Sequence, residues 1–92
     1  MSYGIARTIR LVEIEVLLFA GAAQRAGTRS WQMEIAPGST VCEVRDALTQ
    51  EFSELEDLAH VSRWAINNQF VDLEAVLNES LQIAMIPPVS GG

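Results

Sequence analysis

The sequence predicts a single α+β domain in which one main helix packs across a mixed sheet. Near each end of the chain, apolar residues occupy every second position, which is the period of a strand that buries one face. Between these two runs lies one strong helix signal, a capping box followed by apolar residues at helical spacing. At 92 residues, the chain is long enough for one core and too short for two.

The first strand is predicted within residues 10–20, after a loose leader at residues 1–8. Its alternate positions are apolar, and Glu13 and Glu15 lie on the opposite side. Leu17 and Phe19 make that opposite side apolar as well, so the far end of the strand is predicted to be covered on both faces. The domain proper is therefore expected to span residues 9–86.

A short helical turn and a second strand are predicted next. Residues 22–26 favour one helical turn, and Gly27 stops it because glycine readily adopts the left-handed conformation of a helix end. Residues 31–35 alternate again and predict a strand that ends at Pro37-Gly38.

The main helix is predicted to begin at Thr40 and to run for about 12 residues. The Thr40 hydroxyl and the Glu43 carboxylate have the spacing that satisfies two free amides at a helix start. The apolar residues that follow share one face, which packs on the sheet. They are Val41, Val44, Ala47, Leu48 and Phe52.

The last third of the chain predicts a short helical turn and three strands. The turn is expected within residues 53–59, and residues 64–66 and 70–71 flank an Asn-Asn-Gln turn. A turn near residues 78–79 precedes the final alternating strand, residues 81–86. In this order of elements, the first and last strands can lie side by side.

The charge of the chain disfavours two kinds of partner, and its cysteine content excludes one kind of cross-link. The net charge of −6 disfavours nucleic acid and anionic membranes, which need clustered cations, and favours a basic protein surface. The single cysteine excludes an internal disulfide. Residues 11–19 faintly resemble a secretory signal, but two glutamates inside them make the cytoplasm the expected location.

Residues for self-sufficient catalysis are not recognisable in the chain. Cys42 and His60 are the only thiol and imidazole, and the preferred interpretations are a packing residue and a partly exposed loop residue. A cluster of carboxylates is interpreted as a solvated face, with docking of a basic partner as the alternative. These are Glu51, Glu54, Glu56 and Asp57. No metal site or bound cofactor is predicted.

The most informative segment is the C-terminal arm, residues 87–92. Its two prolines cannot continue a strand as an inner ladder member, so the chain is predicted to leave the fold and extend. Six residues in a polyproline-like path reach about 18–19 Å. Without Cβ atoms, Gly91 and Gly92 fit a narrow channel, and the terminal carboxylate is ionised at neutral pH.

Three segments resemble the small subunits of molybdopterin synthases. They are the strand Ile14–Ala20, Asn67 in the stretch Trp-Ala-Ile-Asn, and the ending Pro-Pro-Val-Ser-Gly-Gly. The similarity covers residues 10–92, and the ending is its specific part. It implies a β-grasp, ubiquitin-like fold and the role of a sulfur carrier that is not itself a catalyst.

The resemblance also implies partners and site residues. An ATP-using adenylyltransferase and sulfurtransferase would adenylate the Gly92 carboxylate and convert it into a thiocarboxylate. The arm would then enter the large synthase subunit and donate sulfur to cyclic pyranopterin monophosphate. The residues that insert are Pro87, Pro88, Val89, Ser90 and Gly91. The expected interface residues are Phe19, Met85 and Ile86.

The chain departs from the family pattern at two positions. Ser80-Leu81 replaces a common Gly-Asp in the turn before the last strand, and Met85-Ile86 replaces two aromatics before the prolines. The first change bears on the turn and the second on the large-subunit contact. Three alternatives stay open: a sulfur carrier for thiamine or tRNA thiolation, a ubiquitin-like protein modifier, and a plain interaction module.

Overall fold

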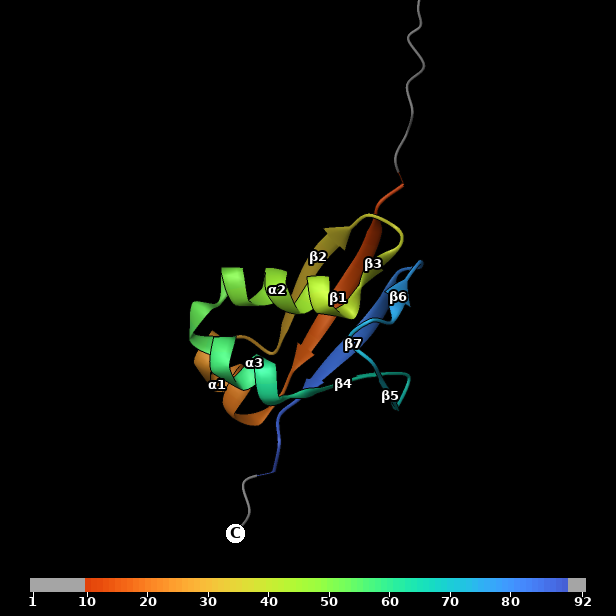
Figure 1. The fold of residues 1–92 in the computed structure, drawn as a ribbon. Coiled ribbons are helices and arrows are strands. Elements are labelled where there is room, and N and C mark those ends of the chain that lie inside the picture. The colour runs from red at the N-terminus through yellow and green to blue at the C-terminus, as the bar shows by residue number, and fades with distance from the viewer. Residues whose placement is uncertain (1–9, 90–92) are drawn as a thin grey trace, which may run out of the picture.

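The computed structural model describes residues 10–89, which form a five-stranded mixed sheet with helices packed on one face and a separate two-stranded sheet (Figure 1). The predicted leader, residues 1–8, lies outside the described residues. The elements in chain order are β1 Val12–Leu18, α1 Ala20–Ala26, β2 Ser30–Ile35, β3 Ser39–Thr40, α2 Val41–Glu51, the 3₁₀ helix η1 Ser53–Leu55, α3 Glu56–Val61, β4 Arg63–Ile66, β5 Gln69–Val71, β6 Val76–Leu77 and β7 Leu81–Ile86.

The central pair of the sheet joins the two ends of the chain. The strand order is β2-β1-β7-β4-β5. Strands β1 and β7 run parallel, with Val16 opposite Ile83, and every other neighbouring pair in this sheet is antiparallel. The prediction that the first and last strands lie side by side is confirmed. Since β7 has a partner on each side, the chain that follows it leaves from the middle of the sheet.

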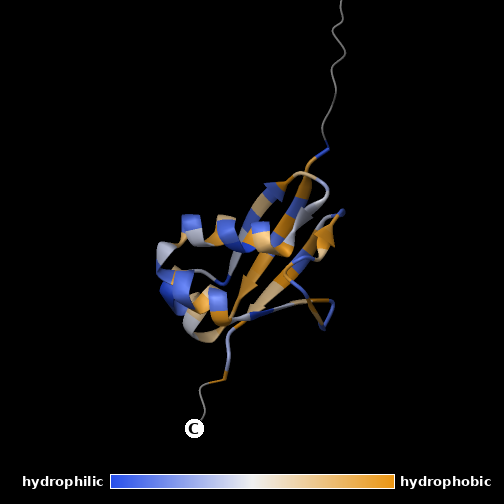
Figure 2. Cartoon of the chain, viewed as in Figure 1, coloured by the Kyte–Doolittle hydropathy of each residue, from blue (hydrophilic) through white to orange (hydrophobic). Residues whose placement is uncertain are grey.

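The core lies between the sheet and α2, which crosses one face with α1 and α3 beside its C-terminal end (Figure 1). Strand alternation supplies one side of this core, and apolar bands on the strands are visible in Figure 2. Trp64 is 2% exposed, and its indole Nε1 is the one buried side-chain nitrogen or oxygen in residues 10–89 without a hydrogen-bond partner. The fully buried side chains include Ile14, Val16, Val41, Val44, Leu48, Leu55, Ile83 and Met85.

The predicted capping box is present at the start of α2. The Glu43 backbone N–H donates to Thr40 Oγ1 at 3.3 Å, and Glu43 Oε1 accepts from the Thr40 backbone N–H at 2.8 Å. The helix runs for 11 residues, one fewer than predicted. It buries Val41, Val44 and Leu48, so the predicted face is confirmed.

Replacing Thr40 by alanine is expected to lower the free energy of unfolding by about 1 kcal/mol, because one free amide at the start of α2 loses its acceptor. Urea denaturation followed by circular dichroism measures this change. Thr49→Ala is the matched control, since Thr49 Oγ1 only donates to the Asp46 carbonyl within the same helix. An equal loss of unfolding free energy in both variants would show that the Thr40 cap does not stabilise α2 more than an ordinary threonine in the helix does.

Three details of the fold differ from the predictions. The two-residue strands β3 and β6 pair with each other, and both are too short to show a period in the sequence. His60 lies in α3 and not in a loop, and its Nδ1 is 2.8 Å from the Glu56 carbonyl oxygen. Leu17 is only half-buried and Phe19 is 49% exposed, so residues 10–89 do not cover the second face at the end of β1.

Candidate functional site

The C-terminal arm leaves the sheet at the end of β7. Pro87 is half-buried, Pro88 is exposed and Val89 is 93% exposed. Residues 87–89 thus follow the end of β7 and belong to no strand or helix. The remaining predicted arm residues, Ser90, Gly91 and Gly92, lie outside the described residues.

The base of the arm is held on both sides. Ladders from β1 and β4 fix β7 up to its last residues, with Met85 opposite Leu18 and Trp64, and Ile86 opposite Arg63. The arm therefore starts from a fixed point, at the end of the sheet opposite the start of β1 (Figure 1).

Met85 and Ile86 have different environments although they are neighbours. Met85 is 0% exposed and belongs to the core, so the prediction that it contacts a partner is wrong. The reason is strand alternation, which turns Met85 toward the helices together with Ile83. Ile86 points to the other face and is only half-buried, so it remains available to a partner.

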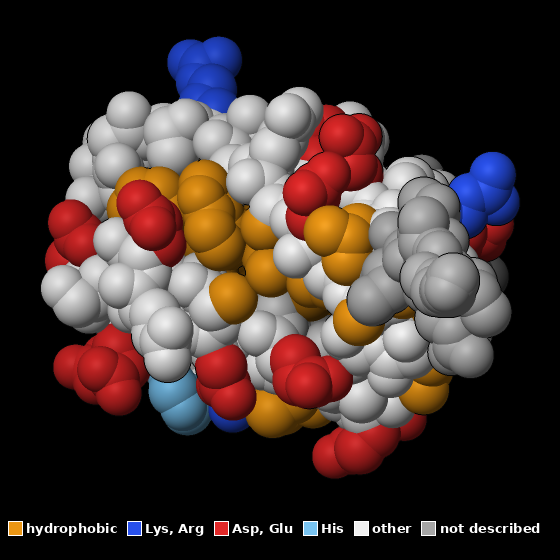
Figure 3. Space-filling model, turned by 90° about the horizontal axis from the view of Figure 1, so that it is seen from above, with side chains coloured by type: hydrophobic (Ala, Val, Ile, Leu, Met, Phe, Trp, Pro, Cys, Tyr) orange, Lys and Arg blue, Asp and Glu red, His pale blue; other side chains and the backbone are white. Residues whose placement is uncertain are grey.

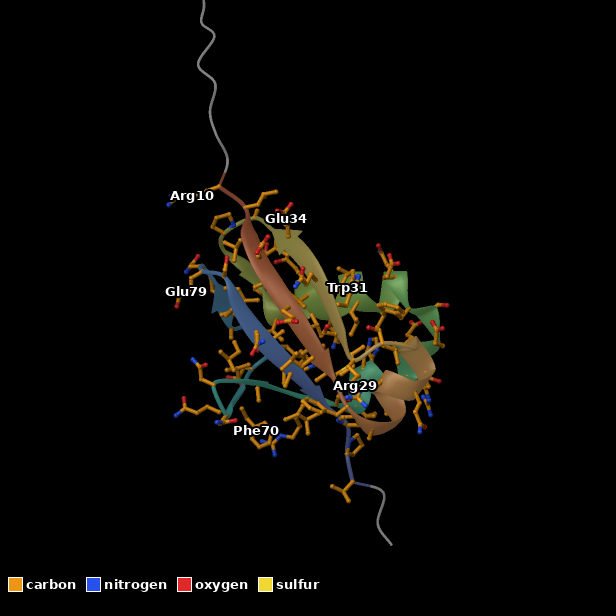
Figure 4. The ribbon with its side chains drawn as sticks, turned by 180° about the vertical axis from the view of Figure 1, so that it is seen from behind. Arg10, Arg29, Trp31, Glu34, Phe70 and Glu79 are labelled. Atoms are coloured by element: carbon orange, nitrogen blue, oxygen red, sulfur yellow. The ribbon has the colours of Figure 1, made fainter. Side chains whose placement is uncertain are left out.

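The face of the sheet opposite the helices, called here the open face, carries a hollow of about 480 Å³. Figure 4 views this side, with the sheet in front of α2. One row of small and apolar side chains crosses four strands at the same level: Leu17, Ala84, Ala65 and Phe70 are consecutive cross-strand partners. The residues that line the hollow are Leu17, Phe19, Ala65, Asn67, Asn68, Phe70, Gln82, Ala84 and Ile86.

Phe19 owes its position to the turn between β1 and α1. Ala20 has a φ of 49°, a left-handed conformation that side-chain-bearing residues seldom adopt. This residue turns the chain from the strand into the helix and leaves the Phe19 ring on the border of the hollow. The sequence singled out Phe19 and Ile86, and the structure brings both to the same hollow.

A tight turn places two amides at the border of the hollow. Asn67 and Asn68 have φ angles of 52° and 65°, which is the conformation that a two-residue hairpin turn between β4 and β5 requires. Asparagine tolerates this conformation better than most residues. Their side chains therefore add hydrogen-bonding groups to the hollow, to which Gln82 also contributes an amide.

The unusual Ser80-Leu81 sequence is accommodated in the turn before β7. Ser80 Oγ accepts from the Glu13 backbone N–H at 3.0 Å, and Leu81 lies opposite Ile14 as the first residue of the ladder. A serine hydroxyl thus ties the start of β7 to β1, and the register of β7 is complete down to Met85.

Other candidate residues do not assemble into a catalytic site. Arg45 Nη2 lies 3.4 Å from Cys42 Sγ in α2, whereas the His60 ring bonds a carbonyl of its own helix. Within residues 10–89, no group of three or more His, Cys, Asp or Glu side chains has the arrangement to hold a metal ion.

The four acidic residues of the predicted cluster are all exposed, around the C-terminal end of α2 and the two short helices that follow. Figure 3 shows acidic side chains spread over the surface seen from above, interrupted by a strip of apolar side chains. Docking of a basic partner on this cluster stays a prediction.

None of the helices in the described part of the chain is both long and apolar enough to span a bilayer.

The comparisons with known proteins agree with this geometry. The ThiS family profile matches residues 16–92. A molybdopterin synthase sulfur carrier subunit of Arabidopsis thaliana is 35% identical over 81 residues, which are 88% of this chain and 84% of the relative.

Two solved structures of similar fold are informative. Small archaeal modifier protein 1 of Haloferax volcanii is 27% identical with a TM-score of 0.79, over 87% of this chain and 99% of that chain. A chain from the complex of subunits 1 and 2 of the molybdopterin-converting factor of Helicobacter pylori is 26% identical with a TM-score of 0.63, over 88% of this chain and 100% of that chain. The predicted β-grasp fold is confirmed. The chain belongs to the ThiS family of sulfur carriers, and within it resembles the sulfur carrier subunits of molybdopterin synthases over most of its length.

Proposed function

We propose that this chain is the sulfur carrier subunit of a molybdopterin synthase and that the carboxylate of Gly92 carries the sulfur. The observation that carries the proposal is the exit of a proline-stiffened arm from the central strand β7. In this proposal, partner proteins bind the folded domain, and the reactive carboxylate lies at the tip of the arm.

The proposed chemistry begins with activation of a poor electrophile. A carboxylate oxygen of Gly92 attacks the α-phosphorus of ATP in an activating partner, and pyrophosphate leaves. The resulting acyl adenylate is attacked at its carbonyl carbon by a sulfur donor, and AMP leaves with the bonding electrons. With a persulfide as the donor, the product is an acyl disulfide, and a thiol of the activating partner cleaves its S–S bond and forms a disulfide with the donor sulfur. The terminus is then a thiocarboxylate, in which one sulfur has replaced one oxygen.

The second half of the proposed cycle takes place in the large subunit. The thiocarboxylate sulfur attacks an oxygen-bearing side-chain carbon of cyclic pyranopterin monophosphate, the C–O bond at that carbon breaks and its oxygen leaves, as water or on the phosphate. Water then hydrolyses the acyl–sulfur bond. Sulfur stays with the pterin and the Gly92 carboxylate is restored. Two such rounds supply the two dithiolene sulfurs, so the carrier must bind and leave the large subunit repeatedly.

The length and composition of the arm support insertion into a partner. Residues 87–92 in an extended path span about 18–19 Å, which is enough to reach a buried site from the surface. Prolines reduce the conformational freedom that the arm loses on insertion. Glycine at the tip offers the least obstruction to attack on the carbonyl carbon.

The hollow on the open face supports docking of the large subunit at the base of the arm. Phe19 is 49% exposed and Phe70 is 54% exposed, and both border the hollow beside Ile86. Large exposed aromatic side chains around a concave surface are typical of protein interfaces. The Helicobacter pylori relative was solved as a complex of subunits 1 and 2.

Intact-mass spectrometry tests the proposal. We expect incubation with ATP, the cognate activating enzyme and a sulfur donor to raise the mass by the difference between sulfur and oxygen. Fragmentation should place the change at Gly92. An unchanged mass, with an enzyme that modifies its own carrier in parallel, would contradict the proposal.

A role as a protein modifier is the second candidate, because the Haloferax volcanii relative carries the name of a modifier. It would use the same activated Gly92 but join it to a lysine of a target. Conjugates of high mass that disappear when Gly92 is deleted would favour this candidate. Sulfur carriage for thiamine or tRNA thiolation would differ only in the acceptor, and we place each of these activities in the cytoplasm.

A further inference from the structure

A stacked cation lies at the border of the open face. The guanidinium carbon of Arg63 is 3.6 Å from the centre of the Phe70 ring, across the β4–β5 hairpin. Phe70 lines the hollow and is 54% exposed, and Arg63 is exposed as well. Figure 4 shows Phe70 at the far edge of the sheet, on the side that the helices leave open.

Stacking prepares the Arg63 side chain for a planar acidic partner. The ring covers one flat side of the guanidinium and leaves its N–H groups free at the edge. Side-chain freedom that is already restricted in the free protein is not lost again on binding. Among residues 10–89, Arg63 has no carboxylate within ion-pair distance, whereas Arg45 is paired with Asp46 at 3.4 Å.

Arg63 also lies next to the base of the arm. It is the register partner of Ile86, the last residue of β7 before Pro87. A partner that follows the arm and contacts Ile86 must therefore approach Arg63. The local positive charge is unusual on a chain of net charge −6, so a carboxylate opposite it would be recognised by sign as well as by shape.

We propose that Arg63, held by Phe70, is a specificity residue that pairs with a carboxylate on the large subunit while the hollow takes an apolar side chain from the same surface. This inference rests on the proposed function. The large subunit is the chosen partner because a complex of the two subunits is known for a relative. The Arg63 pair fixes the orientation in which the arm enters, and the apolar contact supplies most of the affinity.

Equilibrium binding of the unmodified carrier to the large subunit tests this inference without any sulfur chemistry. Relative to wild type, we expect Arg63→Gln to weaken binding about tenfold and Arg63→Glu about a hundredfold. Arg63→Lys should recover part of the loss, because it keeps the charge but loses the planar fork. Raising the salt concentration should weaken wild-type binding more than Arg63→Gln binding.

Arg25→Glu is the matched control. Arg25 is exposed in α1, so the substitution changes the charge equally but away from the open face. We expect it to bind within about twofold of wild type. Thermal unfolding of each variant should match wild type, since neither side chain is in the core.

The outcomes separate this inference from the proposed function. Wild-type binding together with Arg63→Glu binding as tight as Arg25→Glu would overturn the role of Arg63 alone. An equal loss of affinity for the activating enzyme would overturn its specificity for the large subunit. Failure of the wild-type carrier to bind the large subunit would overturn the proposed function and this inference together.

Discussion

Deletion of Gly92 is expected to abolish sulfur transfer to the pterin and to leave the free energy of unfolding within about 0.5 kcal/mol of the wild-type value. The physical reason is the separation between the arm and the core. The chain has left the sheet at Ile86, and Val89 is already 93% exposed, so we expect a deletion three positions beyond Val89 to cost the fold little. Single-turnover conversion of cyclic pyranopterin monophosphate by the reconstituted synthase measures the first quantity, and urea denaturation measures the second.

Adding one residue after Gly92 should have the same effect, because it moves the carboxylate away from the reacting groups of the partner. Even a small displacement of a reacting group can cost about a hundredfold in rate. Deletion of residues 1–8 is the control for truncation as such, since it changes the end of the chain away from the arm. Sulfur transfer by the Gly92 deletion at the wild-type rate would show that another group carries the sulfur.

Local patterns in the sequence predict the elements that have a strong period or a defined end. The alternation in β1, β2 and β7 and the capping box of α2 involve neighbours along the chain, so they can be recognised without knowing the fold. The order of elements also allows the first and last strands to lie side by side, whereas the parallel direction of β1 and β7 is a finding of the structure.

The composition of the open face depends on cross-strand neighbours and could not be predicted in the same way. Leu17 and Phe19 look in sequence like residues covered on both sides, but no segment of residues 10–89 covers them. The stacking of Arg63 on Phe70 depends on the register of β4 and β5. In both cases, the sequence shows only the type of each residue and not which residue lies beside it on the adjacent strand.

The assignment of Met85 and Ile86 shows the same limit at the functional site. Both follow an alternating strand and precede two prolines, so both are reasonable interface candidates from the sequence. Alternation decides between them only when the face of the strand is known, and Ile83 and Met85 share the core face. The residue nearer the arm, Ile86, is therefore the one that a partner can contact.

Aspartate substitutions at Met85 and Ile86 are expected to lower the free energy of unfolding by very different amounts. Met85→Asp places an unpaired carboxylate in the core, where Met85 is 0% exposed, and should cost about 4–5 kcal/mol or more. That loss is close to the whole stability of many small domains, so the variant should be largely unfolded. Ile86→Asp changes a half-buried side chain on the open face and should cost only about 1 kcal/mol.

Ile86→Asp should stay folded and lose affinity for the large subunit. Ile86→Asp places a charge at the apolar contact beside the arm, and we expect its affinity to fall by about 2 kcal/mol or more. Circular dichroism and urea denaturation establish which variants are folded, and calorimetric titration with the large subunit then measures affinity. Global unfolding of Ile86→Asp would assign this side chain to the core. Wild-type affinity of a folded Ile86→Asp would instead move the interface away from the open face and leave the arm as the only contact.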